Sequence, residues 1–114
     1  MLLNNLYRII SSSKDDGLSH YVIAFNPDHS IYSGHFPGQP ITPGACLAKI
    51  VMELLSISKG EEIEPKFITN LKFLAPHRPE QQITVEIAST SESCRFIASL
   101  YNGVEYYAKM TFVI

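Results

Sequence analysis

The chain has 114 residues, of which 46% are hydrophobic and 18% are charged, and its formal net charge is −2 at pH 7. This length suits one domain over residues 1–114, and the lack of a basic excess argues against a nucleic-acid binder. No apolar run approaches the roughly 18 residues that a membrane-spanning helix needs. Two cysteines, Cys46 and Cys94, are too few for a disulfide framework or a metal cluster. We therefore expect a reduced, cytoplasmic protein without a metal.

The first part of the chain predicts a β-hairpin. The segment LSHYVIAF at 18–25 alternates, so that Tyr21, Ile23 and Phe25 share one face of a strand. The shorter segment LYRIISS at 6–12 predicts a strand before it, and the polar SKDDG between them predicts a turn. These two strands are expected to pair with each other.

A helix is predicted from Pro43 to about Lys59. Proline is accepted in the first turn of a helix, and Gly60 is a suitable stop. The apolar residues recur at helical spacing and define one buried face, made of Leu47, Ile50, Val51, Leu54 and Leu55. No other segment predicts a long helix.

After the helix the apolar pattern changes to a period of two, which predicts strands at 66–75, 83–90, 94–101 and 104–114. Asn102 and Gly103 separate the last two, and this dipeptide is a strong hairpin signal because glycine tolerates positive φ. Alternation in the last strand predicts one shared face, made of Val104, Tyr106, Ala108, Met110, Phe112 and Ile114. The full pattern predicts an α+β domain in which an antiparallel sheet of about six strands wraps around one central helix at about 43–59.

The segment GHFPGQPITPG, residues 34–44, precedes this helix and is expected to be stiff because each proline restrains itself and the residue before it. Gly44 and Ala45 fall where a helix presents unpaired N–H groups, which together with the helix dipole could polarise a carbonyl oxygen. His35, if within reach, could remove a proton from the carbon next to that carbonyl. On the residues alone a simpler role is the favoured interpretation, in which His35 only hydrogen-bonds to hold the loop.

The segment YSGHFPGQPITPGACL, followed by an apolar helix, closely resembles the active-site segment of the 3-hydroxyacyl-acyl-carrier-protein dehydratases, which reads approximately GHFPGxPxxPGxL. The resemblance implies a hotdog fold over about residues 6–114 and a dimer that holds acyl chains in a tunnel between its subunits. It also implies a substrate carried as a thioester on acyl carrier protein or coenzyme A, and no further cofactor.

The same resemblance assigns roles to individual residues. His35 matches the catalytic base of the family, and Gly44 matches the helix-start glycine whose N–H polarises the thioester carbonyl. The other residues around these two that are expected to contact substrate are Phe36, Pro37, Gly38, Pro43 and Ala45.

One position departs from the family pattern. The family usually has Glu or Asp five residues after the glycine of the PG pair, where it works with the histidine of the other subunit to protonate the departing hydroxyl. Lys49 stands there in this chain, and Glu53 follows one helical turn later, where the family often has Gln. Without the resemblance, Lys49 and Glu53 are a solvated i,i+4 pair.

Several consequences of this departure remain open. Lys49 could donate the proton itself, or Glu53 could act through a water, and either would give a working 3-hydroxyacyl dehydratase. Alternatively, a second hotdog subunit could supply the carboxylate to His35 in a heterodimer. The chain could also be a hotdog thioesterase or a non-catalytic subunit that binds acyl carrier protein.

Other reactive side chains carry weaker signals. Cys46 falls in the first helical turn, where the dipole could lower a thiol pKa, but a small buried hydrophobe is the favoured interpretation. His20, His29 and His77 show no metal-ligand spacing and are expected to be structural or exposed.

Overall fold

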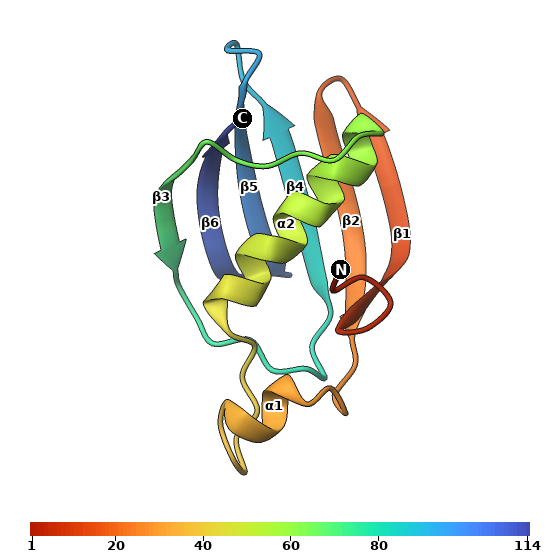
Figure 1. Ribbon diagram of the computed structural model, residues 1–114, viewed down its shortest axis with the longest axis vertical. Coiled ribbons are helices and arrows are strands. Elements are labelled where there is room, and N and C mark those ends of the chain that lie inside the picture. The colour runs from red at the N-terminus through yellow and green to blue at the C-terminus, as the bar shows by residue number, and fades with distance from the viewer.

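The polypeptide forms two helices and six strands, and the computed structural model describes all 114 residues. In chain order these are β1 (Tyr7–Asp15), β2 (Leu18–Phe25), α1 (Ile31–Gly34), α2 (Gly44–Lys59), β3 (Phe67–Phe73), β4 (Ile83–Ser89), β5 (Arg95–Asn102) and β6 (Glu105–Val113). Figure 1 shows α2 crossing one face of the sheet, with α1 beyond its N-terminal end. Neither helix is long and apolar enough to cross a membrane. The predicted strands and the predicted long helix are confirmed.

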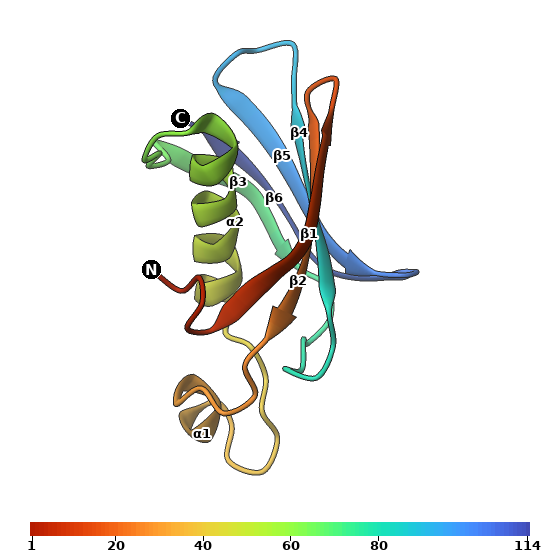
Figure 2. The same cartoon turned by 90° about the vertical axis from the view of Figure 1, so that its right-hand side faces the viewer.

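The six strands form one antiparallel sheet in the order β1-β2-β4-β5-β6-β3. Two tight turns fix the hairpins: Asp16 and Gly17 both have positive φ, 42° and 77°, as a type I′ turn requires, and Gly103 has a φ of 60°. The connection through α2 carries the chain from β2 to β3 at the opposite edge. Figure 2 shows the sheet curving around α2, so this is a hotdog fold.

Helix α2 is held by its apolar face and by its C-terminal cap. Gly60 adopts a left-handed φ of 72°, and its N–H donates to the carbonyls of Ser56 and Ile57. The buried apolar side chains of the helix are the predicted ones, namely Leu47, Ile50, Val51, Leu54 and Leu55. Burying each of these contributes on the order of 1.5–3 kcal/mol, which exceeds what helix propensity supplies.

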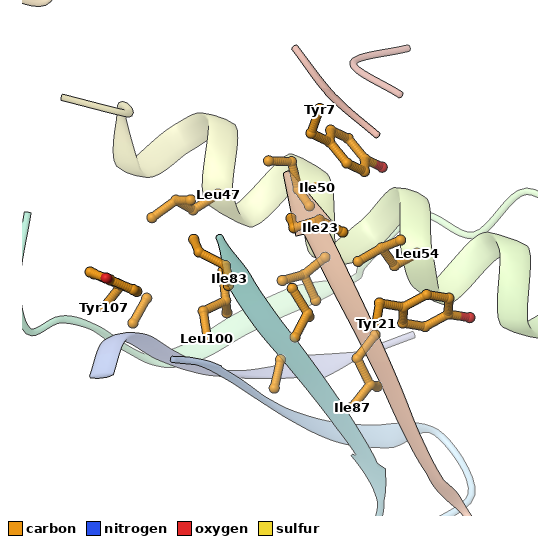
Figure 3. Packing of buried hydrophobic residues seen from close by; sticks show 14 of the residues in the cluster. Tyr7, Tyr21, Ile23, Leu47, Ile50, Leu54, Ile83, Ile87, Leu100 and Tyr107 are labelled. Carbon is orange, nitrogen blue, oxygen red and sulfur yellow. The ribbon is translucent and has the colours of Figure 1, made fainter. Parts of the chain in front are cut away.

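The core lies between α2 and the concave face of the sheet (Figure 3). In Figure 3, Ile23 of β2 lies beside Ile50 and Leu54 of the helix, and Ile83 of β4 lies beneath Leu47. Tyr107 is also buried there. A register shift between Leu100 and Tyr101 makes it the extra residue of a β-bulge, and it and the next residue, Ala108, are both buried.

Strand β3 differs from the others because all seven of its residues are exposed. It pairs only with β6, so its outer edge has no neighbouring strand. Its large apolar side chains remain accessible, with Phe67 63% and Phe73 53% exposed. A free sheet edge that carries apolar side chains is a surface that proteins normally cover.

Candidate functional site

The loop that carries His35 is closed by backbone hydrogen bonds as well as by prolines. Phe36 and Gln39 exchange N–H to carbonyl bonds of 3.0 and 2.9 Å, and the N–H of Ile41 donates to the carbonyl of His35 at 2.9 Å. Gly38 sits in the tight turn with a φ of 77°, which favours glycine. The His35–Phe36 peptide bond is cis. The predicted stiffness of the segment therefore has a physical basis in both proline content and closed hydrogen-bonded rings.

The imidazole of His35 is oriented by the same loop. Its Nδ1 lies 3.1 Å from the carbonyl oxygen of Ile41, and because a carbonyl can only accept, Nδ1 carries the proton in this bond. Its ring stacks on Phe36 with 4.1 Å between centroids. In the neutral ring the basic nitrogen is then Nε2, which makes no hydrogen bond within the chain. A half-buried histidine held this way presents one free basic nitrogen.

The start of α2 supplies two unpaired backbone donors. Pro43 is the N-cap, and its carbonyl accepts the first hydrogen bonds of the helix, from Cys46 at 3.0 Å and Leu47 at 3.2 Å. The N–H groups of Gly44 and Ala45 precede these and have no acceptor inside the helix. They lie at the positive end of the helix dipole and could bind a carbonyl oxygen.

Phe73 lies against the first residue of α2. A Cβ placed on Gly44 would overlap the ring of Phe73, so glycine at this position has a steric reason besides chain turning. The ring itself is about half exposed and belongs to the free edge strand β3. Sequence reasoning missed this contact, since nothing in the pattern of β3 indicates that its last residue reaches the helix start.

A groove of about 920 Å³ runs between α2 and the segment that leads into β3. Ala45, Lys49 and Glu53 line it from the helix, whereas His35 does not. Lys49 is exposed and forms no ion pair. The structure thus brings three of the predicted site residues together on one surface and leaves the histidine loop outside it.

Glu53 is occupied by the N-terminal segment. Its carboxylate is buried, at 8% exposure, and accepts hydrogen bonds from the N–H of Leu2 at 2.7 Å, the N–H of Leu3 at 3.0 Å and the Tyr7 hydroxyl at 3.0 Å. Burial and the Glu53 carboxylate together raise the pKa of Tyr7. No ion pair with Lys49 forms, so the solvated pair considered from spacing is absent, and a catalytic role for Glu53 stays a prediction.

The other reactive side chains have ordinary environments. Burial raises the pKa of the half-buried Cys46 thiol, which argues against an activated nucleophile there. His20 pairs with Glu86 at 2.9 Å, and His29 accepts the N–H of Ile31 at 3.0 Å. No three His, Cys, Asp or Glu side chains gather as metal ligands would.

Comparison with known proteins decides the family. The model of the ApeI-like family, described as ApeI dehydratase, matches residues 11–109, which is most of the chain. The chain belongs to this family. Among curated proteins, a 3-hydroxyacyl-[acyl-carrier-protein] dehydratase FabZ from Geobacter metallireducens is 25% identical over 99 residues, covering 79% of the chain. The chain spans only 63% of the length of that relative.

Solved structures support the same fold. A chain of the dehydratase heterocomplex ApeI:P from Xenorhabdus doucetiae superposes with a TM-score of 0.81 at 17% identity, covering 92% of this chain and 94% of that one. An uncharacterized protein from Erwinia carotovora subsp. atroseptica superposes with a TM-score of 0.63 at 22% identity, covering 92% and 90%. This member of the ApeI-like family therefore shares the hotdog fold with both.

The role of Glu53 as an anchor for the N-terminal segment is testable by stability. Glu53→Ala should lower the free energy of unfolding by about 2–3 kcal/mol, because it removes charge-assisted hydrogen bonds and leaves the buried Tyr7 hydroxyl unpaired. Tyr7→Phe removes one donor only and should cost about 1 kcal/mol. Urea unfolding of both variants measures this. An unfolding free energy unchanged in Glu53→Ala would contradict the anchoring role.

Proposed function

We propose that this protein is a subunit of a dehydratase that converts 3-hydroxyacyl thioesters, carried on acyl carrier protein or coenzyme A, into trans-2-enoyl thioesters. The observation that carries the proposal is the held imidazole of His35, whose Nδ1–H bonds to the Ile41 carbonyl and whose Nε2 is free. The membership in a dehydratase family and the FabZ relative support the same reaction class.

In the proposed mechanism the thioester carbonyl oxygen accepts hydrogen bonds from the N–H groups of Gly44 and Ala45. Nε2 of His35 then takes the proton from the α-carbon, and the electron pair of that C–H bond moves toward the carbonyl, where the two N–H groups stabilise the developing negative charge. The pair returns to form the α,β double bond as the β-carbon to oxygen bond breaks. The hydroxyl leaves as water once it receives a proton.

The proton for the departing hydroxyl requires a second group, and we assign this position to residue 49 of a neighbouring subunit. Lys49 lines the groove and His35 of the same chain does not, which supports a site that two chains share. The unpaired edge of β3 is the surface that supports such an assembly, because it adjoins the groove at Ile68 and exposes apolar side chains. The neighbour is a second copy or another hotdog subunit.

Assembly through β3 predicts that a charge on this edge produces monomers. Ile68→Lys, at a residue 39% exposed in the isolated chain, should dissociate the dimer because an ammonium would be buried at the interface. The matched control is Ile97→Lys on β5, where the side chain is 45% exposed but lies on an interior strand of the sheet. Light scattering after size-exclusion chromatography measures the mass of each, and a dimeric Ile68→Lys would rule out this edge.

A second candidate role is favoured by one residue. Lys49 occupies the position where a carboxylate would be the natural proton donor, so the chain could pair with a different hotdog subunit that carries Glu or Asp there. A chain of similar fold belongs to the dehydratase heterocomplex ApeI:P, which supports this arrangement. His35 of this chain would then work with the carboxylate of its partner.

The proposed function is tested by supplying 3-hydroxyacyl thioesters to the purified protein, alone and together with candidate hotdog partner subunits. Formation of enoyl thioester, followed by its ultraviolet absorbance and by mass spectrometry, is the expected result in at least one of these combinations. Hydrolysis to free acid without enoyl product would indicate a thioesterase and overturn the proposal.

A further inference from the structure

A buried chain of polar side chains lies behind the His35 loop and takes no part in the mechanism above. Tyr32, Thr42 and His77 are 4%, 4% and 1% exposed. The Tyr32 hydroxyl lies 2.8 Å from Oγ1 of Thr42, which lies 2.7 Å from Nδ1 of His77. Nε2 of His77 lies 2.6 Å from the carbonyl oxygen of Gln81. The segment 32–42 and the segment 77–81, which are far apart in the sequence, are joined in this way.

The donor in each of these hydrogen bonds follows from the groups involved. The Gln81 carbonyl can only accept, so Nε2 of His77 carries a proton. In the neutral ring Nδ1 is then an acceptor, and the Thr42 hydroxyl must donate to it. The single proton of Thr42 is thereby used, so the Tyr32 hydroxyl donates to Thr42. Only one arrangement satisfies all of these groups while His77 is neutral.

The surroundings of His77 favour that neutral form. Its ring packs on Phe25 of β2, with 4.3 Å between centroids, and edge-on to Tyr107 of β6 at 5.1 Å. Burial lowers the pKa of His77, against a smaller opposing effect of the Gln81 carbonyl and the Glu80 carboxylate. The titratable groups around it are Tyr107, whose ring packs on it, and Glu80, whose charge acts on it, while Tyr32 is joined to it through Thr42.

Thr42 connects these hydrogen-bonded side chains to both parts of the proposed catalytic site, the His35 loop and the start of α2. Its backbone N–H donates to the carbonyl of His77 at 2.8 Å. The preceding residue, Ile41, supplies the carbonyl that holds Nδ1 of His35, and the helix start at Gly44 lies two residues beyond. A displacement of Thr42 would therefore move the support of His35 and the first N–H donor of α2 together.

We propose that His77, acting through Thr42, is a positioning residue that holds the His35 loop and the start of α2 in their reactive arrangement, and that protonation of His77 releases this arrangement. Protonated His77 donates from both nitrogens, so the Thr42 hydroxyl must turn away and donate to Tyr32, whose own proton loses its acceptor. The inference rests on the proposed function for its catalytic meaning, whereas the coupling between the two histidines is a property of the fold alone.

The test uses a pair of variants at one position. Thr42→Val keeps the volume and the backbone bond to His77 but removes the hydroxyl, and Thr42→Ser restores the hydroxyl. Nuclear magnetic resonance of the imidazole nitrogens of the full chain, titrated with acid, reports His35 and His77 separately. We expect Thr42→Val to shift the His35 resonances and Thr42→Ser to return them toward those of the wild-type protein.

Activity supplies the second readout. In Thr42→Val, kcat for dehydration should fall by about 10- to 100-fold with little change in KM, since misplacement affects the reacting groups more than substrate affinity. In the wild-type protein both histidines must be neutral, so the fall of kcat toward acid pH should follow two ionisations. In Thr42→Val the link between the histidines is broken, so the fall should follow one ionisation. Tyr32→Phe removes the hydroxyl at the far end of the hydrogen-bonded series and should give a smaller change in the same direction. This variant replaces Thr42→Val as the test if Thr42→Val does not fold.

The two proposals fail in distinguishable ways. His35 resonances and kcat that stay at wild-type values in Thr42→Val, while the His77 resonances move, would overturn the positioning role. A wild-type protein that forms no enoyl product in any combination would overturn the proposed function, and the His35 resonances would still decide whether the two histidines are coupled.

Discussion

His35→Asn is expected to reduce dehydration by about 10²–10⁴-fold, the usual contribution of a general base, in whichever assembly is active. Asparagine keeps a short side chain with an N–H that can still donate to the Ile41 carbonyl, so the loop should remain closed. The substitution removes only the basic nitrogen. Initial rates of enoyl thioester formation measure the loss, and urea unfolding should show that the variant is as stable as the wild-type protein.

The matched control for this substitution removes a histidine elsewhere. His20 lies on β2 and pairs with Glu86 on the neighbouring strand, on a partly exposed part of the sheet. His20→Asn should therefore leave the dehydration rate within about twofold of the wild type, because that ring contacts neither the loop nor the helix start. A His35→Asn protein with undiminished activity would remove the base from the mechanism and leave His35 as a loop-holding residue.

The regular elements of this fold could be predicted because their signals are local. Helix α2 ends at Gly60, which adopts the left-handed conformation that a stop signal requires, and the turn at Gly103 joins β5 to β6 as expected. The stiff loop before α2 was likewise predictable from its prolines. In each case a few neighbouring residues determine the backbone conformation.

The face of the sheet on which each side chain of the last strand lies was not predictable from alternation. The pattern of period two placed Val104 and Tyr106 on the same face as Ala108, yet Val104 is 98% exposed and Tyr106 is 39% exposed. Val104 lies in the turn before β6, and a bulge opposite Leu100 and Tyr101 shifts the register between Tyr106 and Ala108, so this part of the prediction was wrong. A single inserted residue reverses facing, and no sequence pattern marks where it occurs.

The polar residues of the site region show a second limit. Glu53 accepts hydrogen bonds from the backbone of Leu2 and Leu3, about fifty positions away in sequence, and Nδ1 of His77 is paired with Thr42, 35 positions away. Hydrogen bonds of this kind depend on which segments the fold brings together, so composition and spacing give no sign of them. His77, expected as a structural or exposed loop residue, is structural and fully buried.

Lys49→Glu is expected to raise the dehydration rate of the protein acting alone by about 10²-fold or more, because a carboxyl group is a better proton donor to the departing hydroxyl near neutral pH. The same substitution should leave the rate unchanged when a partner subunit already supplies a carboxylate to His35. Lys49→Met tests whether the ammonium of Lys49 itself donates the proton. If it does, the protein acting alone loses activity in this variant.

The control for charge is Lys14→Glu, which makes the same change on β1, at the opposite edge of the sheet from the groove. It should have no effect on rate, so that a gain limited to position 49 reports contact with the reacting group and not the net charge of the subunit. Rates of Lys49→Glu and Lys49→Met that both equal the wild-type rate, in the protein alone, would mean that residue 49 does not face His35 across an interface. Because Lys49 lines the groove beside β3 while His35 lies outside it, these rates determine whether two chains share one site.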